Sequence, residues 1–302
     1  MMPVNMKKGA VTPVADGIAQ DIQHGWKASL NLGFTQRGDK TVLKSRSQSG
    51  PLAIQRPLYP DGQSCHVYIL HPPGGVVGGD SLAITVSAGE DSDVLLTTPG
   101  ATKFYRSENR YAKQTQTLYI KKGASLAWLP QENIFFPDAY SQLNTQIYLD
   151  SDALFWGWEM HCFGLPAQNE GFVHGHLVGK TEIYIDGQRV VTEGVNFHGE
   201  DKLFINNGLL GRSMMGTFYF TAQDDELLKL VQELLMSITT AKRSHSDKLP
   251  LLIGVTQIEG LMVVRALGDW SEDILQAFSQ IWQLSRQYLG KDHVDAPRIW
   301  AT

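Results

Sequence analysis

Apolar and polar residues alternate with a period of two along most of the chain. In Ser81–Ala88, the side chains of Leu82, Ile84 and Val86 point one way and the residues between them point the other. Such alternation is typical of β-strands with one buried face. The same pattern recurs in residues 115–120, 144–149 and 181–185. We therefore predict a β-rich body over residues 25–222 and a flexible N-terminal segment over residues 1–24.

Turn signals separate these predicted strands at intervals of roughly ten residues, a spacing typical of antiparallel β architecture. Asp186-Gly187 suits a tight hairpin, because glycine tolerates the positive φ that such a turn requires. Strands do not alternate with long helices, so a doubly wound nucleotide-binding fold is disfavoured. The body is expected to be a large, layered β structure.

The hydrophobic period changes after residue 223, where acidic residues open a helical pattern that Lys242 and Arg243 close. Two strands are predicted next, over residues 251–257 and 261–266, followed by a second helix with Ser271 as its N-cap and Gly290 as its stop. The first helix is predicted to bury Leu227, Leu230, Val231, Leu234 and Ile238, and the second Ile274, Phe278, Ile281, Trp282 and Ser285. Residues 223–302 are thus predicted to form a small α-β-β-α element packed on the body.

Composition narrows the classes of function. The 302 residues carry a net charge of −5, which argues against a nucleic-acid partner, since phosphate binding needs a basic face. No apolar run reaches the roughly 18 residues of a membrane span, and no hydrophobic block follows Lys7 and Lys8 as a secretory signal would require. A cytoplasmic protein without membrane contact is predicted, with Cys65 and Cys162 as free thiols.

Common catalytic signatures are missing. The glycine-rich stretch 71–80 (HPPGGVVGGD) has no phosphate-binding lysine, and a strand rather than a helix follows it. His174 and His176 would share one face of a strand, where they could supply two imidazoles to a metal ion or simply face solvent. Glu132 and Glu159 lie among aromatic residues, so each is either a hydrogen-bonded core acid, with Arg106 or Arg110 as a candidate partner, or part of a polar passage.

Three segments together resemble the UreD (UreH) family of urease accessory proteins. They are residues 71–80, 97–107 (TTPGATKFYRS) and 128–137 (WLPQENIFFP), supported by 50–59, 157–162, 211–218 and 297–300. Leu165 departs from the family pattern, which has arginine there. The resemblance implies a β-helix-like fold and a non-enzymatic scaffold. Such a scaffold binds apo-urease and recruits a helical accessory protein (UreF type) and a nickel-carrying GTPase (UreG type).

The resemblance also implies an internal route for nickel in transit, with no tightly bound cofactor. Asp80 and Thr102 match motif positions expected on that route, and Glu132 and Glu159 are added because nickel accepts carboxylate oxygen. A conduit should bind its ion weakly, through separated oxygens, since tight binding would stop transit. His174 and His176 are candidates for a surface loading point, and Trp300 for a contact with the helical partner.

Two other functions compete with this interpretation. A cytoplasmic β-helical carbohydrate hydrolase could use Glu132 and Asp138 as paired carboxylates, with Trp128, Phe135 and Phe136 stacking on sugar rings. A nickel-storage protein would need dense histidine or cysteine ligands, whereas the nine histidines are scattered along the chain.

Overall fold

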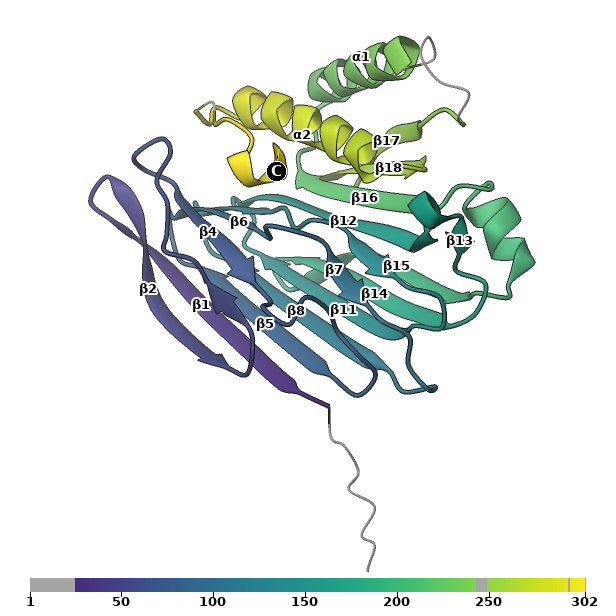
Figure 1. The fold of residues 1–302 in the computed structure, drawn as a ribbon. Helices are drawn as coiled ribbons and strands as arrows, with labels where there is room; N and C mark the ends of the chain where they lie inside the picture. Colours follow the sequence, from purple (N-terminus) through teal and green to yellow (C-terminus); the bar gives the residue numbers. More distant parts are fainter. Residues whose placement is uncertain (1–24, 243–248, 293, 302) are drawn as a thin grey trace, which may run out of the picture.

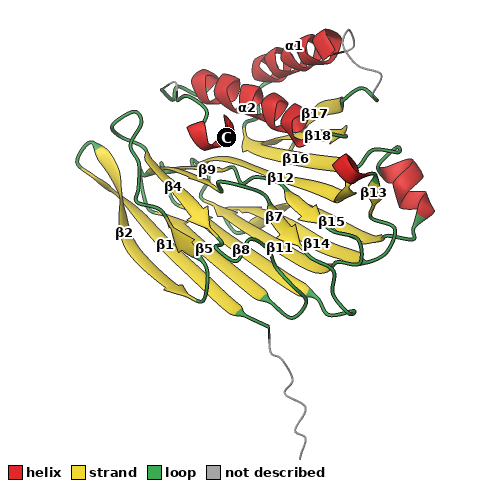
Figure 2. Cartoon of the chain, in the orientation of Figure 1, coloured by secondary structure: helices red, strands yellow, loops and turns green. Residues whose placement is uncertain are grey.

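Two β-sheets lie face to face and form the body of the molecule (Figure 1). The computed structural model describes residues 25–242, 249–292 and 294–301, so the predicted flexible segment 1–24 lies outside the described residues. Helices α1 (Asp225–Lys242) and α2 (Ser271–Tyr288) cover the outer face of one sheet, as Figure 2 shows in red against the yellow strands. The predicted mainly β class with a C-terminal α-β-β-α element is confirmed.

The first sheet has seven strands and contains all four segments predicted from alternation. Ser81–Ala88 is a strand with the predicted bounds, and the other three predicted strands are each longer than expected. The strands, in spatial order, are β15 (Gln188–His198), β14 (His176–Ile185), β11 (Tyr140–Leu149), β8 (Ala112–Ile120), β5 (Ser81–Ala88), β1 (Lys27–Arg37) and β2 (Lys40–Ser49).

The second sheet has eleven strands, of which β16 to β18 carry the body into the C-terminal element. Its main path is β17 (Leu252–Ile258), β18 (Leu261–Gly268), β16 (Met214–Thr221), β12 (Leu154–Leu165), β9 (Ser125–Trp128), β6 (Asp93–Thr97), β4 (Cys65–Leu70) and β3 (Ala53–Ile54). Three short strands lie off this path, β7 (Thr102–Phe104), β10 (Asn133–Phe135) and β13 (Glu170–Gly171).

The chain passes back and forth between the two sheets, so its central strands stack as parallel coils of a β-solenoid. Parallel pairs join β1, β5, β8, β11 and β14 in one sheet, and β4, β6, β9 and β12 in the other. The expectation of antiparallel architecture is therefore wrong for the centre of the body. A turn signal marks where the chain changes direction, but here the next strand lies in the opposite sheet instead of beside its predecessor. Antiparallel pairing occurs towards the ends, for example at the predicted Asp186-Gly187 hairpin between β14 and β15, where φ is 49° and 79°.

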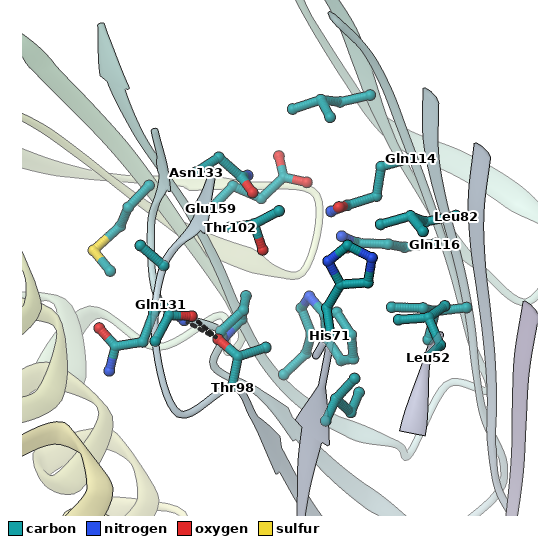
Figure 3. Close-up of a pocket in the computed structure, with 18 of the residues that line it drawn as sticks. Leu52, His71, Leu82, Thr98, Thr102, Gln114, Gln116, Gln131, Asn133 and Glu159 are labelled. Atoms are coloured by element: carbon teal, nitrogen blue, oxygen red, sulfur yellow. Dashed lines mark hydrogen bonds between the residues drawn. The ribbon is translucent and has the colours of Figure 1, made fainter. Parts of the chain in front are cut away.

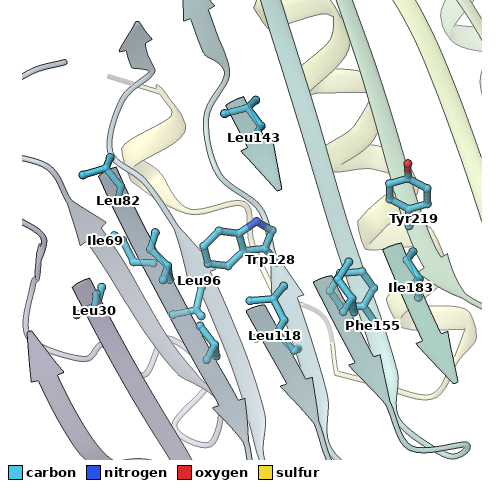
Figure 4. Packing of buried hydrophobic residues seen from close by; sticks show 14 of the residues in the cluster. Leu30, Ile69, Leu82, Leu96, Leu118, Trp128, Leu143, Phe155, Ile183 and Tyr219 are labelled. Carbon is cyan, nitrogen blue, oxygen red and sulfur yellow. The ribbon is translucent and has the colours of Figure 1, made fainter. Parts of the chain in front are cut away.

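The core has two parts, one on each side of the second sheet. Between the sheets, Leu118, Trp128 and Phe155 pack with aliphatic side chains from both layers (Figure 4). On the other face, Trp156 and Trp158 of β12 pack against α2 residues such as Phe278. Because both faces of β12 are covered, its sequence lacks the polar alternation of the first sheet. Cys65 and Cys162 are buried free thiols, as predicted.

The C-terminal element follows the prediction with two corrections. In α1 the fully buried face contains Leu235, whereas the predicted Leu230 and Leu234 are only half-buried. Ser271 is the first helical residue of α2 and not its N-cap, which is Trp270. All five residues predicted to be buried on α2 are buried, and Gly290 follows the helix with φ of 75°. Of the helices described, none is long and apolar enough to cross a bilayer.

Candidate functional site

A cavity of about 220 Å³ opens between the two sheets, and the three family-like sequence blocks meet around it. The glycine-rich block contributes His71, Gly74 and Gly75, the second block contributes residues 98–102, and the third contributes Gln131 and Asn133. Figure 3 shows His71, Thr102 and Asn133 on the side of the cavity opposite or beside Gln114 and Gln116 of β8. Segments that are far apart in the sequence thus build one interior site.

A second, smaller cavity of about 40 Å³ adjoins the first, and Leu143 and Glu159 line both. Its other polar side chains include His161, Glu193, Thr217 and Tyr219. Glu159 therefore stands at the junction between the two cavities.

Two threonines of the first sheet hold the Glu159 carboxylate, which comes from the second sheet. Thr145 Oγ1 donates to Oε1 at 2.5 Å, and Thr181 Oγ1 donates to Oε2 at 2.7 Å. Thr145 lines the larger cavity and Thr181 the smaller one. Each carboxylate oxygen is thus bonded to a residue of a different cavity, and both donors are neutral hydroxyls.

Strand register explains why the polar side chains converge. On the first sheet, one row of paired residues crosses four strands, and on the second sheet a matching row crosses three. Residues paired in register point to the same face of a sheet. The first row is Gln116, Thr145, Thr181 and Glu193, and the second is Glu159, Thr217 and Arg265. The two rows face each other across the interior, linked by the hydrogen bonds of Glu159 and Glu193.

Two buried polar atoms at the larger cavity have no protein partner within the described part of the chain. They are Gln116 Oε1 and Trp128 Nε1, on residues that are only 7% and 3% exposed. Buried polar atoms are normally hydrogen-bonded, by water where protein groups are absent. Both residues line the cavity, so water inside it could supply the missing partners of these two atoms.

Imidazole nitrogen is also present in this interior. His161 lines the smaller cavity, and its Nδ1 lies 3.4 Å from Nδ2 of Asn133, which lines the larger one. Burial lowers the pKa of His161, although the nearby Glu159 carboxylate acts in the opposite direction. Burial likewise lowers the pKa of His71 at the larger cavity. Neutral imidazoles are the form in which histidine binds a metal ion.

Of the four predicted route residues, Thr102 and Glu159 line the cavity, and Asp80 and Glu132 do not. Asp80 Oδ1 accepts from the Trp26 backbone N–H at 2.8 Å and Oδ2 from that of Val77 at 3.0 Å, so its carboxylate fixes the glycine-rich loop. Glu132 faces the start of α2, where Ser271 donates a hydrogen bond to it. Burial, reinforced by the nearby Glu272, raises the pKa of Glu132.

The two histidines predicted to share a strand face do not do so, because β14 begins at His176 and Gly175 has φ of 107°. His174 Nδ1 lies 3.0 Å from Glu200 on the surface. His176 bonds to Tyr111 and Asn196 and stacks on His198 at 3.8 Å between ring centroids. Within the described ranges, no group of three or more His, Cys, Asp or Glu residues is arranged to hold a metal ion. A loading role for His174 and His176 stays a prediction.

Trp300 packs on the core instead of projecting from it. Its indole N–H donates to Thr97 Oγ1 at 2.9 Å, and its ring lies 5.4 Å from that of Trp158 and 6.2 Å from that of Trp282. The side chain is nevertheless partly exposed, so a contact with a helical partner stays a prediction.

The residues predicted for a carbohydrate hydrolase are not assembled into a site. Glu132 faces α2, whereas the exposed Asp138 lines a separate open hollow with Arg106. Phe135 is fully buried and stacks on Phe104, so it offers no platform for a sugar.

Several polar residues of the interior were not predicted from the sequence. The row members Gln116, Thr145, Thr181 and Glu193 each occupy an inward position between apolar residues of the same face, and β8 and β11 carry a second inward polar residue each, Gln114 and Ser141. A polar residue that interrupts an apolar face in several strands is the signal that could have revealed them.

Comparison with known proteins agrees with the sequence blocks that surround the cavity. The family model of the UreD urease accessory protein matches residues 27–301. A urease accessory protein UreD of Aliivibrio fischeri (strain MJ11) is 43% identical over 279 residues, covering 92% of this chain and 97% of the relative. The proteins of the same name from Escherichia coli and Klebsiella aerogenes are 40% and 37% identical, covering 92% and 93% of this chain and 98% of each relative. The chain therefore belongs to the UreD family of urease accessory proteins.

Proposed function

We propose that this protein is a non-enzymatic cytoplasmic scaffold for nickel insertion into urease. It binds apo-urease, recruits a UreF-type helical protein and a UreG-type nickel-carrying GTPase, and lets nickel pass through its interior as cargo. Relatives that share 37–43% of its residues over nearly their whole length are named urease accessory proteins, which supports a role beside urease.

The position of Glu159 carries the proposal for an internal route. Its carboxylate lies where the two cavities meet, and each oxygen accepts a hydrogen bond from a threonine of a different cavity. A cation that moves from one cavity to the other passes this negative charge. Among the described residues, the two donors to the carboxylate are neutral hydroxyls, so its charge is available to attract a cation.

The surrounding donors suit weak, sequential binding of nickel. Amide, hydroxyl and carboxylate oxygens and single imidazoles are spread along the cavities, and all are ligands that nickel(II) accepts. Such spacing allows an ion to enter and leave, which transit requires.

Co-expression with urease tests the route. Glu159→Gln removes the charge and keeps the side-chain size, and we expect it to lower the nickel content of purified urease several-fold. Glu182→Gln is the matched control, because Glu182 lies on β14 but pairs with Lys180 and Arg189 instead of lining either cavity. Normal nickel occupancy with Glu159→Gln, in a complex that still assembles, would exclude passage at this point.

The scaffold role needs a separate test, because it can hold without the route. We expect the wild-type chain to co-elute with urease subunits and with the two accessory proteins on size exclusion, and to hydrolyse no GTP when purified alone. Failure to associate with any of these proteins, or GTP turnover that a point substitution in this chain abolishes, would refute the scaffold.

A further inference from the structure

The two polar rows of the interior end in an ion pair at the edge of the sandwich. Glu193 ends the row on β15, the last strand of the first sheet, and Arg265 ends the row on β18 of the second sheet. Their contact is bidentate, with Arg265 Nε 3.2 Å from Glu193 Oε1 and Nη2 2.9 Å from Oε2. This pair joins the two sheets: Glu193 lines the smaller cavity, and Arg265 lines an adjoining surface hollow that shares Met215 and Thr217 with it.

The Glu193 carboxylate is bonded on two sides, so no oxygen is left free for a cation from the cavity. Tyr219 donates to its Oε2 at 2.8 Å from inside the cavity, and the Arg265 guanidinium approaches from the solvent side. The Arg265 side chain is 51% exposed, whereas that of Glu193 is 26% exposed. The guanidinium therefore stands between an interior carboxylate and water, in the place that a cation leaving the cavity would take.

Other basic groups around the smaller cavity do not neutralise its carboxylates. Lys180 lines the cavity, but its ammonium lies 2.8 Å from Glu182, which the cavity does not include. Among the described residues, Arg265 is thus the cation whose salt bridge reaches a carboxylate of this cavity.

We propose that Arg265 is a plug for the smaller cavity, whose guanidinium occupies the cation position at Glu193 and must leave before a divalent cation can bind there. The proposal rests on the internal nickel route described above. It adds that the Arg265 guanidinium closes the outer end of that route. The guanidinium can be drawn away because it is half exposed, so a carboxylate on a docked protein can take over its hydrogen bonds.

Nickel binding to the purified full-length chain tests the plug without urease. Arg265→Gln leaves Glu193 without its cation, and we expect nickel affinity measured by calorimetry to rise about tenfold, since a unit charge a few ångströms away is removed. Arg265→Met serves the same purpose if the glutamine variant unfolds. The double variant Arg265→Gln/Glu193→Gln should return to the wild-type affinity, and Arg265→Lys should stay near it because the charge is kept.

A matched control separates a local effect from a general loss of positive charge. Arg189→Gln frees Glu182, whose carboxylate does not line the cavity, and should leave nickel affinity unchanged. Equal affinities of wild type and Arg265→Gln would overturn the plug, as would an equal rise in Arg189→Gln. The outcome is independent of the route test. If nickel affinity rises in Arg265→Gln while Glu159→Gln still loads urease fully, the plug is retained and the route is rejected. If nickel affinity is unchanged in Arg265→Gln while Glu159→Gln lowers urease loading, the route is retained and the plug is rejected.

Discussion

Arg286 on α2 reaches Asp93 at the start of β6, although 193 residues separate them in the chain. Its Nη2 lies 3.1 Å from Asp93 Oδ2, and its Nε donates to the Asp292 carbonyl at 3.1 Å. The guanidinium also stacks 6.0 Å from the Trp156 ring. One buried arginine thus links the C-terminal helix to the solenoid and also holds the segment that follows the helix, through the Asp292 carbonyl.

Replacing Arg286 by methionine should destabilise the whole protein. The Arg286 side chain is 6% exposed and that of Asp93 is 23% exposed, so the substitution leaves a largely desolvated carboxylate whose remaining cation among the described residues is Lys291, 3.7 Å away. Removing one partner of such a pair costs about 3 kcal/mol in the free energy of unfolding. Urea denaturation followed by tryptophan fluorescence measures the loss.

Lys121→Met provides the control for that measurement. Lys121 pairs with Asp150 at 3.8 Å, but the two side chains are 51% and 41% exposed, so the pair should contribute less than about 1 kcal/mol. Similar losses for Arg286→Met and Lys121→Met would show that burial of the Arg286 pair has no energetic consequence.

A second prediction concerns acid stability and His66, which is buried and lies 3.1 Å from the Ser64 hydroxyl through Nε2. Burial lowers the pKa of His66 to about 4, with smaller opposing effects from Asp61 and Asp93 and a supporting one from Arg286. Between pH 6.5 and about 4 the unfolded chain binds a proton at this histidine and the folded chain does not. Stability should therefore fall as the pH drops through that window, by about 3 kcal/mol in total from this residue.

His66→Gln isolates the contribution of His66 from that of the other titrating groups. We expect the free energy of unfolding of the variant to depend less steeply on pH between 6.5 and 4.5 than that of the wild type. The comparison uses urea titrations at several pH values. Parallel pH profiles for the two proteins would contradict the assignment of the acid sensitivity to His66.

The positions of the strands could be predicted from the sequence more reliably than the pairing between strands. Alternation located Ser81–Ala88 with its observed bounds, because the inward and outward faces of that strand differ in polarity. Whether the next strand lies beside it or in the opposite sheet depends on long-range packing, which the turn residues do not encode. In α1, Leu230 and Leu235 both suit an apolar face, and the packing of the helix against β17 and α2 decides which is fully buried.

For the candidate site as well, the sequence identified individual residues but not the contacts between them. Glu159 was identified because a carboxylate among aromatic residues needs partners, but those partners, Thr145 and Thr181, come from strands of the opposite sheet. Asp80 lies in a recognisable block, yet its carboxylate bonds to the backbone. Sequence patterns indicate which residues are unusual, whereas register across the sheets determines which of them meet.

A third prediction tests a glycine on which the sheet edge depends. Gly164 in β12 has φ of 86°, and a Cβ there would lie 2.3 Å from the Glu170 carbonyl oxygen and 2.7 Å from the Gly171 carbonyl carbon. Because backbone atoms cannot move aside cheaply, Gly164→Ala should lower the free energy of unfolding by more than about 2 kcal/mol.

Gly187→Ala is the matched control for Gly164→Ala. Gly187 has φ of 79°, but no other atom lies within 4 Å of the position that a Cβ would take, so only the strain of the left-handed conformation, about 1 kcal/mol, applies. The midpoint temperature of thermal unfolding should be lower for Gly164→Ala than for Gly187→Ala. The reverse order would contradict the argument from close approach.

The last prediction concerns the two hydroxyls that hold Glu159. The double variant Thr145→Val/Thr181→Val keeps the shape of both side chains but removes the donors at 2.5 and 2.7 Å, so the carboxylate is no longer fixed between the cavities. We expect it to lower the nickel content of co-expressed urease several-fold, with a stability loss of only about 1 kcal/mol, because water in the cavity can replace the lost donors. The variant Thr145→Ser/Thr181→Ser retains both hydroxyls and should load urease normally. Thr117→Val, on the outward face of β8, controls for the loss of a threonine hydroxyl outside the cavities. If the valine and serine double variants loaded urease equally, the placement of the carboxylate by these threonines would have no part in nickel transit.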